Sequence, residues 1–293
     1  MKTLVIGASG CVGGILYEDF QELGEVSGTY CQHPWKELIP LDITRPDDAR
    51  RLLDQFQPDL VLQPAAQPNV DGCEENPGDS YRVNVGGTSN VVEATRTTRA
   101  KYVFFSSDYV FDGKAGPYGE EDPPNPIQVY GRHKLEAERL IRERLDNFLI
   151  IRVHGVFGWE RQRKNFVVRL VQLLSEGKTM TVPSDQVGSP TYAPNLSQAL
   201  RELVLQDARG IYHLVGSTVI DRYSFARLAA TIFGLDAGLL VPKTTADLKQ
   251  KAARPLTSGL CIDKARRELK TRLWSAEESL RHMKATRPAE PMT

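Results

Sequence analysis

The chain has 293 residues, of which 41% are hydrophobic and 25% are charged, as in ordinary globular proteins. Its 37 basic and 37 acidic residues give a formal net charge of zero, which argues against nucleic-acid binding by bulk charge. The opening run MKTLVIG is too short for a signal peptide or a membrane span, and no other apolar stretch is long enough. We therefore expect neither a nucleic-acid partner nor a membrane partner.

The cysteines are scattered and form no C-x-x-C pair, which disfavours a zinc site or a redox dithiol. Reduced thiols in a cytoplasmic protein fit this pattern best. The four residues are Cys11, Cys31, Cys73 and Cys261.

The first half of the chain alternates short apolar runs with helical patterns. Strands are predicted at 2–7, 25–30, 38–43, 59–66, 101–111 and 148–158. Helices are predicted at 12–23, 46–56 and 77–98, and at a segment that begins near Tyr130. Beyond residue 155 the pattern is less regular, with helices at 165–177, 196–206 and 221–234 and a strand at 210–216.

Continuous apolar strands that alternate with helices indicate a parallel sheet covered on both faces. We therefore predict an α/β fold, a Rossmann-type doubly wound sheet with a smaller C-terminal substrate-binding lobe. Residues 1–154 are expected to form the dinucleotide-binding domain, and residues 155–293 mainly the lobe. Segments near 190–216 are expected to return to the first domain.

A glycine loop, GASGCVGG, follows the first predicted strand and opens the first predicted helix. Gly7, Gly10 and Gly13 have the spacing G-x-x-G-x-x-G, which permits a tight turn and a close approach of backbone N–H groups to a pyrophosphate. The helix N-terminus adds partial positive charge at Cys11 and Val12. The loop and its context predict dinucleotide binding.

The end of the second strand, GTYCQHPWK, bears on the choice of cofactor. An acid there would hold an adenosine ribose and repel a 2′-phosphate, and none is present. This favours NADPH, with NADH as the alternative, and His33 or Lys36 could reach a phosphate. Asp42, followed by Ile43, could accept from the adenine amino group; the alternative is that Asp42 or Thr44 caps the next helix.

Tyr130 and Lys134 are four residues apart, so they share one face of a helix. A free phenol has a pKa of about 10, and a neighbouring ammonium is expected to lower it. Such a tyrosine could exchange protons near neutral pH. The alternative is a chance pairing on an exposed helix.

Together, these features and several longer motifs resemble the extended short-chain dehydrogenases/reductases, and within them the dTDP-4-dehydrorhamnose reductase family. The resemblance covers most of the chain. The motifs that carry it are GASGCVGG, PAAQPNVDGCEENP, VNVGGT, SSDYVFDG, PYGEEDPPNPIQVYGRHKLEAE, KNFV, DQVGSPTY and ARPLTSGL.

The resemblance implies roles for the matching residues. Tyr130 would protonate the C4 carbonyl oxygen of a sugar, Lys134 would hold the nicotinamide ribose, and Ser107 would hydrogen-bond the same oxygen. Further substrate contacts are implied for Asp108, Tyr109 and Asn165, and cofactor contacts for Asp42, Ile43, Ala65 and Ala66. Asn84 would brace the site, or alternatively bridge buried backbone. A homodimer is also implied, and no metal-ligand pattern stands out.

Two departures from the family pattern leave the sugar open. The run HGVFG, His154 to Gly158, stands where the family often has one like S-W-V-Y-G, so the tryptophan after the first position is missing, and Gly259 replaces the arginine of N-S-R-L. The expected reaction is NADPH-dependent reduction of a nucleotide-linked 4-keto-6-deoxy sugar, dTDP-4-dehydrorhamnose to dTDP-rhamnose. Another nucleotide-linked 4-keto-6-deoxyhexose is the second choice of substrate.

Three other functions share parts of the pattern. A 4,6-dehydratase needs Asp-Glu after the serine, whereas Asp108 is followed by Tyr109 here. An epimerase shares the serine and Tyr-x-x-x-Lys but lacks DYVFDG. A non-catalytic, NADP-binding regulatory subunit, similar to the beta subunit of methionine adenosyltransferase, is the alternative from another class.

Overall fold

A seven-stranded parallel sheet forms the centre of the protein in the computed structural model, which describes residues 1–35 and 37–288. The strand order is β3-β2-β1-β4-β5-β6-β9, and every neighbouring pair is parallel. The strands are β1 (Lys2–Val5), β2 (Glu25–Tyr30), β3 (Ile39–Pro40), β4 (Leu60–Gln63), β5 (Lys101–Ser107), β6 (Phe148–Val153) and β9 (Gly210–His213).

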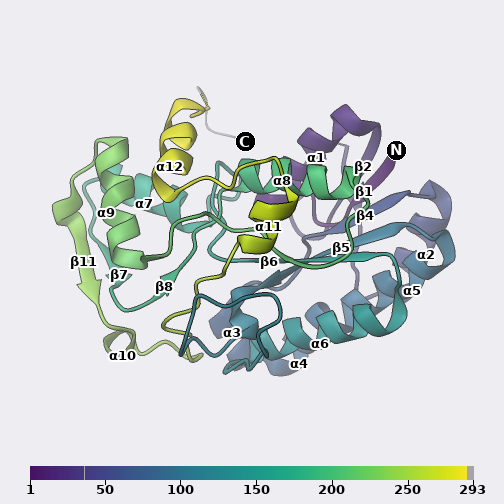
Figure 1. Cartoon of the computed structure of the whole chain (residues 1–293), viewed down its shortest axis with the longest axis horizontal. Helices are drawn as coiled ribbons and strands as arrows, with labels where there is room; N and C mark the ends of the chain where they lie inside the picture. Colours follow the sequence, from purple (N-terminus) through teal and green to yellow (C-terminus); the bar gives the residue numbers. More distant parts are fainter. Residues whose placement is uncertain (36, 289–293) are drawn as a thin grey trace.

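Helices cover both faces of this sheet (Figure 1). On one face lie α1 (Cys11–Asp19) and α8 (Ala193–Leu205), and on the other lie α2 (Pro46–Phe56), α5 (Thr88–Thr98) and α6 (Val129–Arg144). Strand β5 is buried along its whole length, with Val103 and Phe105 in the core under α1 and α8, and Tyr102 and Phe104 in the core under α2 and α5. The predicted doubly wound α/β fold is confirmed.

The chain reverses its direction of travel across the sheet between β1 and β4. From β1 it runs outward to β2 and β3, and then returns to β4 on the opposite side of β1. Ligands of such sheets bind at the carboxyl ends of the strands beside this switch point. Strand β9 extends the sheet beyond β6, and α8, which precedes it, packs against α1.

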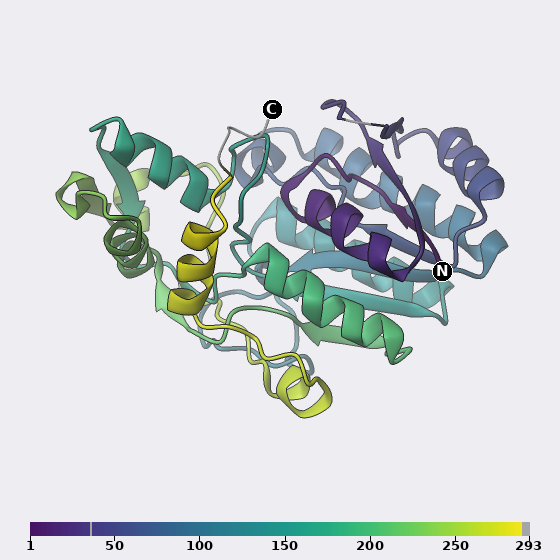
Figure 2. The same ribbon diagram turned by 90° about the horizontal axis from the view of Figure 1, so that it is seen from above.

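A smaller lobe with its own apolar core lies beside the sheet (Figure 2). Its strand pairs are β7 with β11, which are parallel, and β8 with β10, which are antiparallel. Its elements are α7 (Phe166–Ser175), β7 (Met180–Pro183), β8 (Val187–Gly188), β10 (Ile220–Asp221), α9 (Arg222–Phe233), β11 (Leu240–Lys243) and α12 (Ala276–Ala285). The sequence analysis predicted α7 and α9 but none of these short strands, which pair only through contacts between distant segments.

Several elements of the sheet half differ from their predictions, and the strands predicted at 101–111 and 148–158 end at Ser107 and Val153. Strand β3 has only two residues, which pair with Thr29 and Tyr30 of β2 at the sheet edge, and the last bond of this pairing is from Leu41 N to the Tyr30 carbonyl oxygen at 2.8 Å. The predicted helix 77–98 is three segments, α4 (Pro77–Tyr81), the π-helical turn η2 (Arg82–Gly87) and α5. A Cβ on Gly87 would lie 2.6 Å from the side chain of Ile43, so the glycine permits the close contact between η2 and the loop that follows β3.

Short segments complete the part of the chain that the structure describes. They are α3 (Val70–Glu75), α10 (Thr245–Leu248), α11 (Asp263–Glu268), and the 3₁₀ turns η1 (Phe20–Leu23), η3 (Asp108–Val110) and η4 (Ala237–Leu239). Among the described residues, no helix combines the length and the apolar character that crossing a membrane requires.

A buried ion pair fastens α6 to β6. Arg152 Nε donates to Glu138 Oε1 at 3.0 Å, and Arg152 Nη2 donates to Glu138 Oε2 at 2.7 Å. The two side chains are 3% and 2% exposed. The pair therefore fixes the position of α6, the helix that carries Tyr130 and Lys134.

We expect Glu138→Gln to lower the free energy of unfolding by about 3–5 kcal/mol, because the Arg152 guanidinium would stay buried without its counter-charge. Urea denaturation measures this. The matched control is Glu277→Gln, which breaks the exposed pair with Arg281 and should cost less than about 1 kcal/mol. Equal losses in the two variants would contradict an anchoring role for the buried pair.

Candidate functional site

The glycine loop lies at the carboxyl end of β1, where the doubly wound sheet has its switch point. A Cβ on Gly13 would lie 2.1 Å from the Gly7 carbonyl oxygen, so the protein's own packing requires that glycine. A Cβ on Gly10 would meet only the same oxygen, at 3.5 Å. Gly10 is the N-cap of α1, and the first N–H groups of that helix, at Cys11 and Val12, have no acceptor within it. This open, amide-lined surface fits a pyrophosphate.

A loop between β6 and α7 reaches across to this surface. Gln162 Nε2 donates to the Ser9 carbonyl oxygen at 2.9 Å, and Lys164 Nζ lies 3.2 Å from His33 Nε2. The Arg161 guanidinium stacks on the Trp35 ring, 3.4 Å from its centroid. The sequence analysis missed these contacts, which join residues more than a hundred positions apart. The predicted phosphate ligand Lys36 lies outside the described residues.

Asp42 is tied to its own loop. Thr44 N and Thr44 Oγ1 donate to Asp42 Oδ1 at 2.9 and 2.7 Å, and the Thr44 hydroxyl is the main cause of a lowered Asp42 pKa. The alternative that Asp42 or Thr44 caps the next helix is wrong, because the N-cap of α2 is Arg45, without a side-chain cap. The adenine contact of Asp42 stays a prediction, as does the cofactor contact of the buried Ile43.

The segment after β4 lies beside the glycine loop. Ala65 N donates to the Ile6 carbonyl oxygen at 3.0 Å, and a Cβ on Gly7 would lie 3.0 Å from Ala65. Asn84 holds the continuation of this segment, because its Oδ1 accepts from Gln67 N at 2.8 Å and its Nδ2 donates to Gln67 O at 3.2 Å. Asn84 thus bridges the two sides of the Gln67 backbone, although Gln67 itself is exposed, and the cofactor contacts of Ala65 and Ala66 stay predictions.

The three predicted catalytic residues meet at the carboxyl end of β5. Ser107 ends that strand, and Tyr130 and Lys134 lie on one face of α6. Helix α6 reaches the strand end because of Gly131, whose Cβ would lie 2.0 Å from the Tyr109 carbonyl oxygen. The Tyr109 and Tyr130 rings meet edge to face, with centroids 6.1 Å apart, and Tyr109 N donates to Ser107 Oγ at 3.2 Å.

The expectation that Lys134 lowers the pKa of Tyr130 is wrong for this structure. Lys134 Nζ donates to the Phe105 carbonyl oxygen at 2.8 Å and lies 5.9 Å from the centroid of the Tyr130 ring. Burial, and then the negative charge of Asp108, raise the pKa of Tyr130 above its usual value. Burial also lowers the pKa of Lys134, to about 8. Tyr130 is therefore a neutral phenol at physiological pH.

The Asp108 carboxylate is the centre of a buried hydrogen-bond network. Its Oδ1 accepts from Ser107 Oγ at 2.9 Å, and its Oδ2 accepts from Ser258 Oγ at 2.6 Å and His154 Nδ1 at 2.7 Å. The sequence analysis gave no role to Ser258 or His154, although one lies in a quoted motif and the other begins a run that departs from the family pattern. Spacing alone could not reveal that they meet at Asp108.

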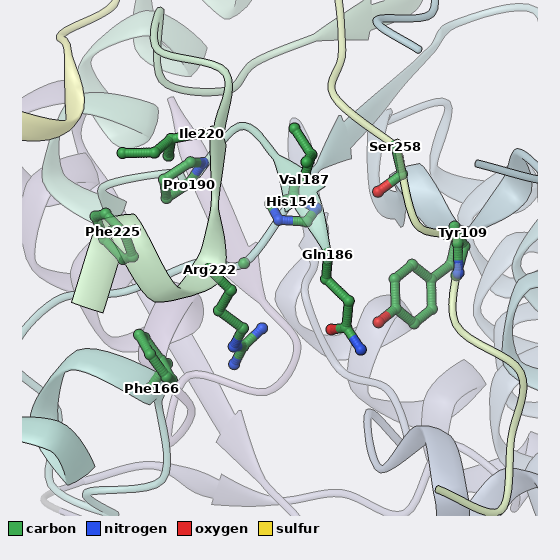
Figure 3. A pocket seen from close by; sticks show the side chains of 12 residues that line it. Tyr109, His154, Phe166, Gln186, Val187, Pro190, Ile220, Arg222, Phe225 and Ser258 are labelled. Atoms are coloured by element: carbon green, nitrogen blue, oxygen red, sulfur yellow. The ribbon is translucent and has the colours of Figure 1, made fainter. Parts of the chain in front are cut away.

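A pocket opens beside this network, between the sheet edge and the lobe (Figure 3). Its polar side chains Tyr109, Gln186 and Arg222 extend toward one another in the view of Figure 3. Tyr109 is the one predicted substrate residue that lines it directly. The pocket is lined by Tyr109, His154, Gly155, Phe166, Gln186, Val187, Pro190, Ile220, Arg222, Phe225, Pro255 and Ser258.

Arg222 brings positive charge into this pocket. Its guanidinium lies over the Phe166 ring, 4.3 Å from the centroid, and burial lowers its pKa. Among residues 1–35 and 37–288, no carboxylate forms an ion pair with it, whereas Arg254 pairs with Asp71 at 2.9 Å. An anionic ligand group would therefore find a partly desolvated cation that has no fixed counter-charge.

Asn165, the remaining predicted substrate residue, is engaged elsewhere. It is the N-cap of α7, where its Oδ1 accepts from Val168 N at 3.2 Å. Its Nδ2 donates to Gly158 O at 2.8 Å and to Glu160 Oε1 at 2.9 Å. The structure therefore does not bring Asn165 to the pocket; its side chain fixes the start of a lobe helix.

Comparisons with known proteins identify the family of the chain. A family model described as RmlD substrate binding domain matches residues 1–287. dTDP-4-dehydrorhamnose reductase of Sinorhizobium fredii is 34% identical, over 77% of this chain and 79% of that protein. The crystal structure of dTDP-4-dehydrorhamnose reductase from Bacillus anthracis in complex with NADP has a TM-score of 0.88 and 26% identity, covering 96% of this chain and 98% of that one. Methionine adenosyltransferase 2 subunit beta of Danio rerio is 29% identical, over 88% and 82%.

The open surface at Gly10 gives a selective test of cofactor binding. We expect Gly10→Val to abolish NADPH binding in calorimetry while the thermal unfolding midpoint stays near wild type, because the side chain enters ligand space and not the core. Gly14→Ala is the matched control: its Cβ would meet only the Ala8 carbonyl oxygen, at 3.4 Å, so binding should persist. Unchanged affinity in Gly10→Val would refute the assigned pyrophosphate surface.

The lowered pKa of Lys134 predicts a pH window in stability. Its folded pKa of about 8 lies below the unfolded value, so from about pH 8 to 10 the unfolded chain binds more protons and the stability contributed by this group rises with pH. Lys134→Met removes this titration. Urea denaturation should show wild type gaining on the order of 1 kcal/mol relative to the variant between about pH 7.5 and 9.5. A constant difference would contradict the shift.

Proposed function

Because the chain belongs to the family described as RmlD substrate binding domain, we propose that it is an NADPH-dependent reductase of a nucleotide-linked 4-keto-6-deoxy sugar. The most fitting reaction is conversion of dTDP-4-dehydrorhamnose to dTDP-rhamnose. The observation that carries the proposal is the meeting of Ser107, Tyr130 and Lys134 at the end of β5, beside a pocket that contains Arg222.

The side chains around the carbonyl supply the proton. A bound nicotinamide supplies the hydride for carbonyl reduction. The Tyr130 phenol, whose pKa burial raises, stays protonated and donates to the oxygen on which negative charge develops. Ser107 Oγ turns from Asp108 Oδ1 to donate to the same oxygen. Lys134, held by the Phe105 carbonyl oxygen, is assigned to the ribose hydroxyls of the cofactor.

The pocket supports a nucleotide-linked substrate. Arg222 is a cation without a described counter-charge, and the diphosphate that joins a nucleoside to a sugar would pair with it. Tyr109 and the sheet edge would contact the sugar, and the lobe would contact the nucleotide. We accordingly propose that the sheet half, with α8 and β9, is the cofactor-binding unit of a cytoplasmic enzyme, and that the remaining residues after 155 form the substrate-binding unit.

The end of β2 supports NADPH as the cofactor. No acid follows the strand, and His33 and Lys164 meet there at 3.2 Å. A 2′-phosphate at this position would accept charge-assisted hydrogen bonds from both. NADH, the alternative, would leave these groups without that partner.

The direct test follows NADPH oxidation at 340 nm with dTDP-4-dehydrorhamnose and with other nucleotide-linked 4-keto-6-deoxyhexoses. We expect turnover with at least one of them, and a kcat/KM with NADPH above that with NADH by roughly tenfold or more. Cofactor binding without turnover of any such sugar would favour a regulatory subunit, the alternative suggested by the methionine adenosyltransferase relative.

Tyr130→Phe should lower kcat by about two to four orders of magnitude, the usual effect of losing a positioned proton donor. The ring contact with Tyr109 would remain, so NADPH affinity and the unfolding midpoint should stay near wild type. NADPH absorbance measures the rate of reduction, and calorimetry measures NADPH affinity and the unfolding midpoint. A near-normal kcat would refute the assigned role of the phenol.

A further inference from the structure

His154 is a polar side chain at the pocket wall that the proposed mechanism does not use. It follows β6, and its ring lies against Gly188 of β8 so closely that a Cβ on that glycine would be 2.2 Å from both Cε1 and Nε2. The side chain is 20% exposed, and it lines the pocket beside Tyr109 and Arg222. Gly188 therefore leaves room for the imidazole, and contact with β8 fixes the position of the ring.

The hydrogen bonds of His154 leave one ring nitrogen without a partner. The Asp108 carboxylate accepts from Nδ1 at 2.7 Å, and it also accepts from Ser107 Oγ and Ser258 Oγ. A carboxylate with three donors fixes the proton on Nδ1. Among the described residues, Nε2 has no hydrogen-bond partner, so it is the ring atom left for a ligand.

The chemistry of this free nitrogen selects its partner. In the neutral ring Nε2 is an acceptor, and in the cation it is a donor. A hydroxyl satisfies both forms, whereas a carbonyl oxygen satisfies only the cation and a methyl group satisfies neither. A 4-keto-6-deoxyhexose joined through C1 has a carbonyl at C4, its ring oxygen on C5 and a methyl at C6. Its only hydroxyls are therefore those at C2 and C3.

We propose that His154, oriented by Asp108, is a substrate-positioning residue that binds the C2 or C3 hydroxyl of the sugar. This rests on the proposed function for the identity of the sugar. The same carboxylate accepts from Ser107 Oγ in this structure, so the anion that orients His154 lies beside the hydroxyl that turns to the carbonyl oxygen.

The test pairs enzyme variants with substrate analogues. His154→Asn can keep the bond to Asp108 but lacks the far nitrogen, and His154→Gln can return an amide to that position. With the full substrate, His154→Asn should lose roughly tenfold in kcat/KM, almost all of it in KM, and His154→Gln should recover part of the loss. Two substrate analogues lack the hydroxyl at C2 or at C3. For the analogue that lacks the hydroxyl bound by His154, the kcat/KM of wild type should fall by a similar factor, whereas the kcat/KM of His154→Asn should stay nearly unchanged.

Two controls separate this role from a structural one. His282→Asn removes an imidazole that contacts Tyr192 in the lobe and should leave KM unchanged. NADPH affinity should be equal in all variants. The proposal is overturned if removal of the C2 hydroxyl and removal of the C3 hydroxyl each lower kcat/KM equally in wild type and in His154→Asn. It is also overturned if the loss caused by His154→Asn is confined to kcat.

Binding measurements keep this proposal distinct from the proposed function. Calorimetry with the reduced sugar nucleotide compares wild type with His154→Asn. His154-dependent binding without turnover would refute the reductase but support the role of His154. Normal turnover with His154-independent KM would refute only the role of His154. If the wild type binds no nucleotide-linked 6-deoxyhexose, the reductase function and the role of His154 are both overturned.

Discussion

The approach of helix α6 to the end of strand β5 is the constraint on which the site depends. Gly131 permits it, since any side chain there would strike the Tyr109 backbone. Three contacts then hold the helix: Val129 N donates to Glu74 Oε2 at 2.9 Å, Lys134 reaches the Phe105 carbonyl oxygen, and Glu138 pairs with Arg152. The helix that carries the phenol and the ammonium is thus held beside the serine by close packing, hydrogen bonds and an ion pair before any ligand arrives.

What the sequence predicts well is local. The alternation of apolar strands with helices arises from burial on both faces of a parallel sheet, and it identified the fold and most of the sheet. The glycine loop and the pair Tyr130 and Lys134 were recognisable because each is set by neighbours along one turn or one helix face. Strand β3 was overestimated, because an apolar pattern does not show that its only partner, β2, ends at Tyr30.

The features that the sequence could not predict depend on contacts between distant segments. His154 and Ser258 meet at Asp108 from three separate parts of the chain, and Arg222 enters the pocket from the lobe. The pKa of Tyr130 rises where the sequence suggested a fall, since burial and the direction of Lys134 outweigh simple proximity. The hydrogen bonds of Asn165 likewise belong to a helix start that a motif match cannot distinguish from a ligand contact.

The path of the chain through the sheet has a consequence for how such proteins diversify. Strand β9 and helix α8 come after the first lobe elements, yet they complete the sheet edge beside β6 and the face beside α1. The lobe is thus interleaved with the scaffold and cannot be exchanged as a contiguous cassette. A change of substrate is therefore made most directly by replacing single side chains of the pocket wall, such as His154, within a fixed framework.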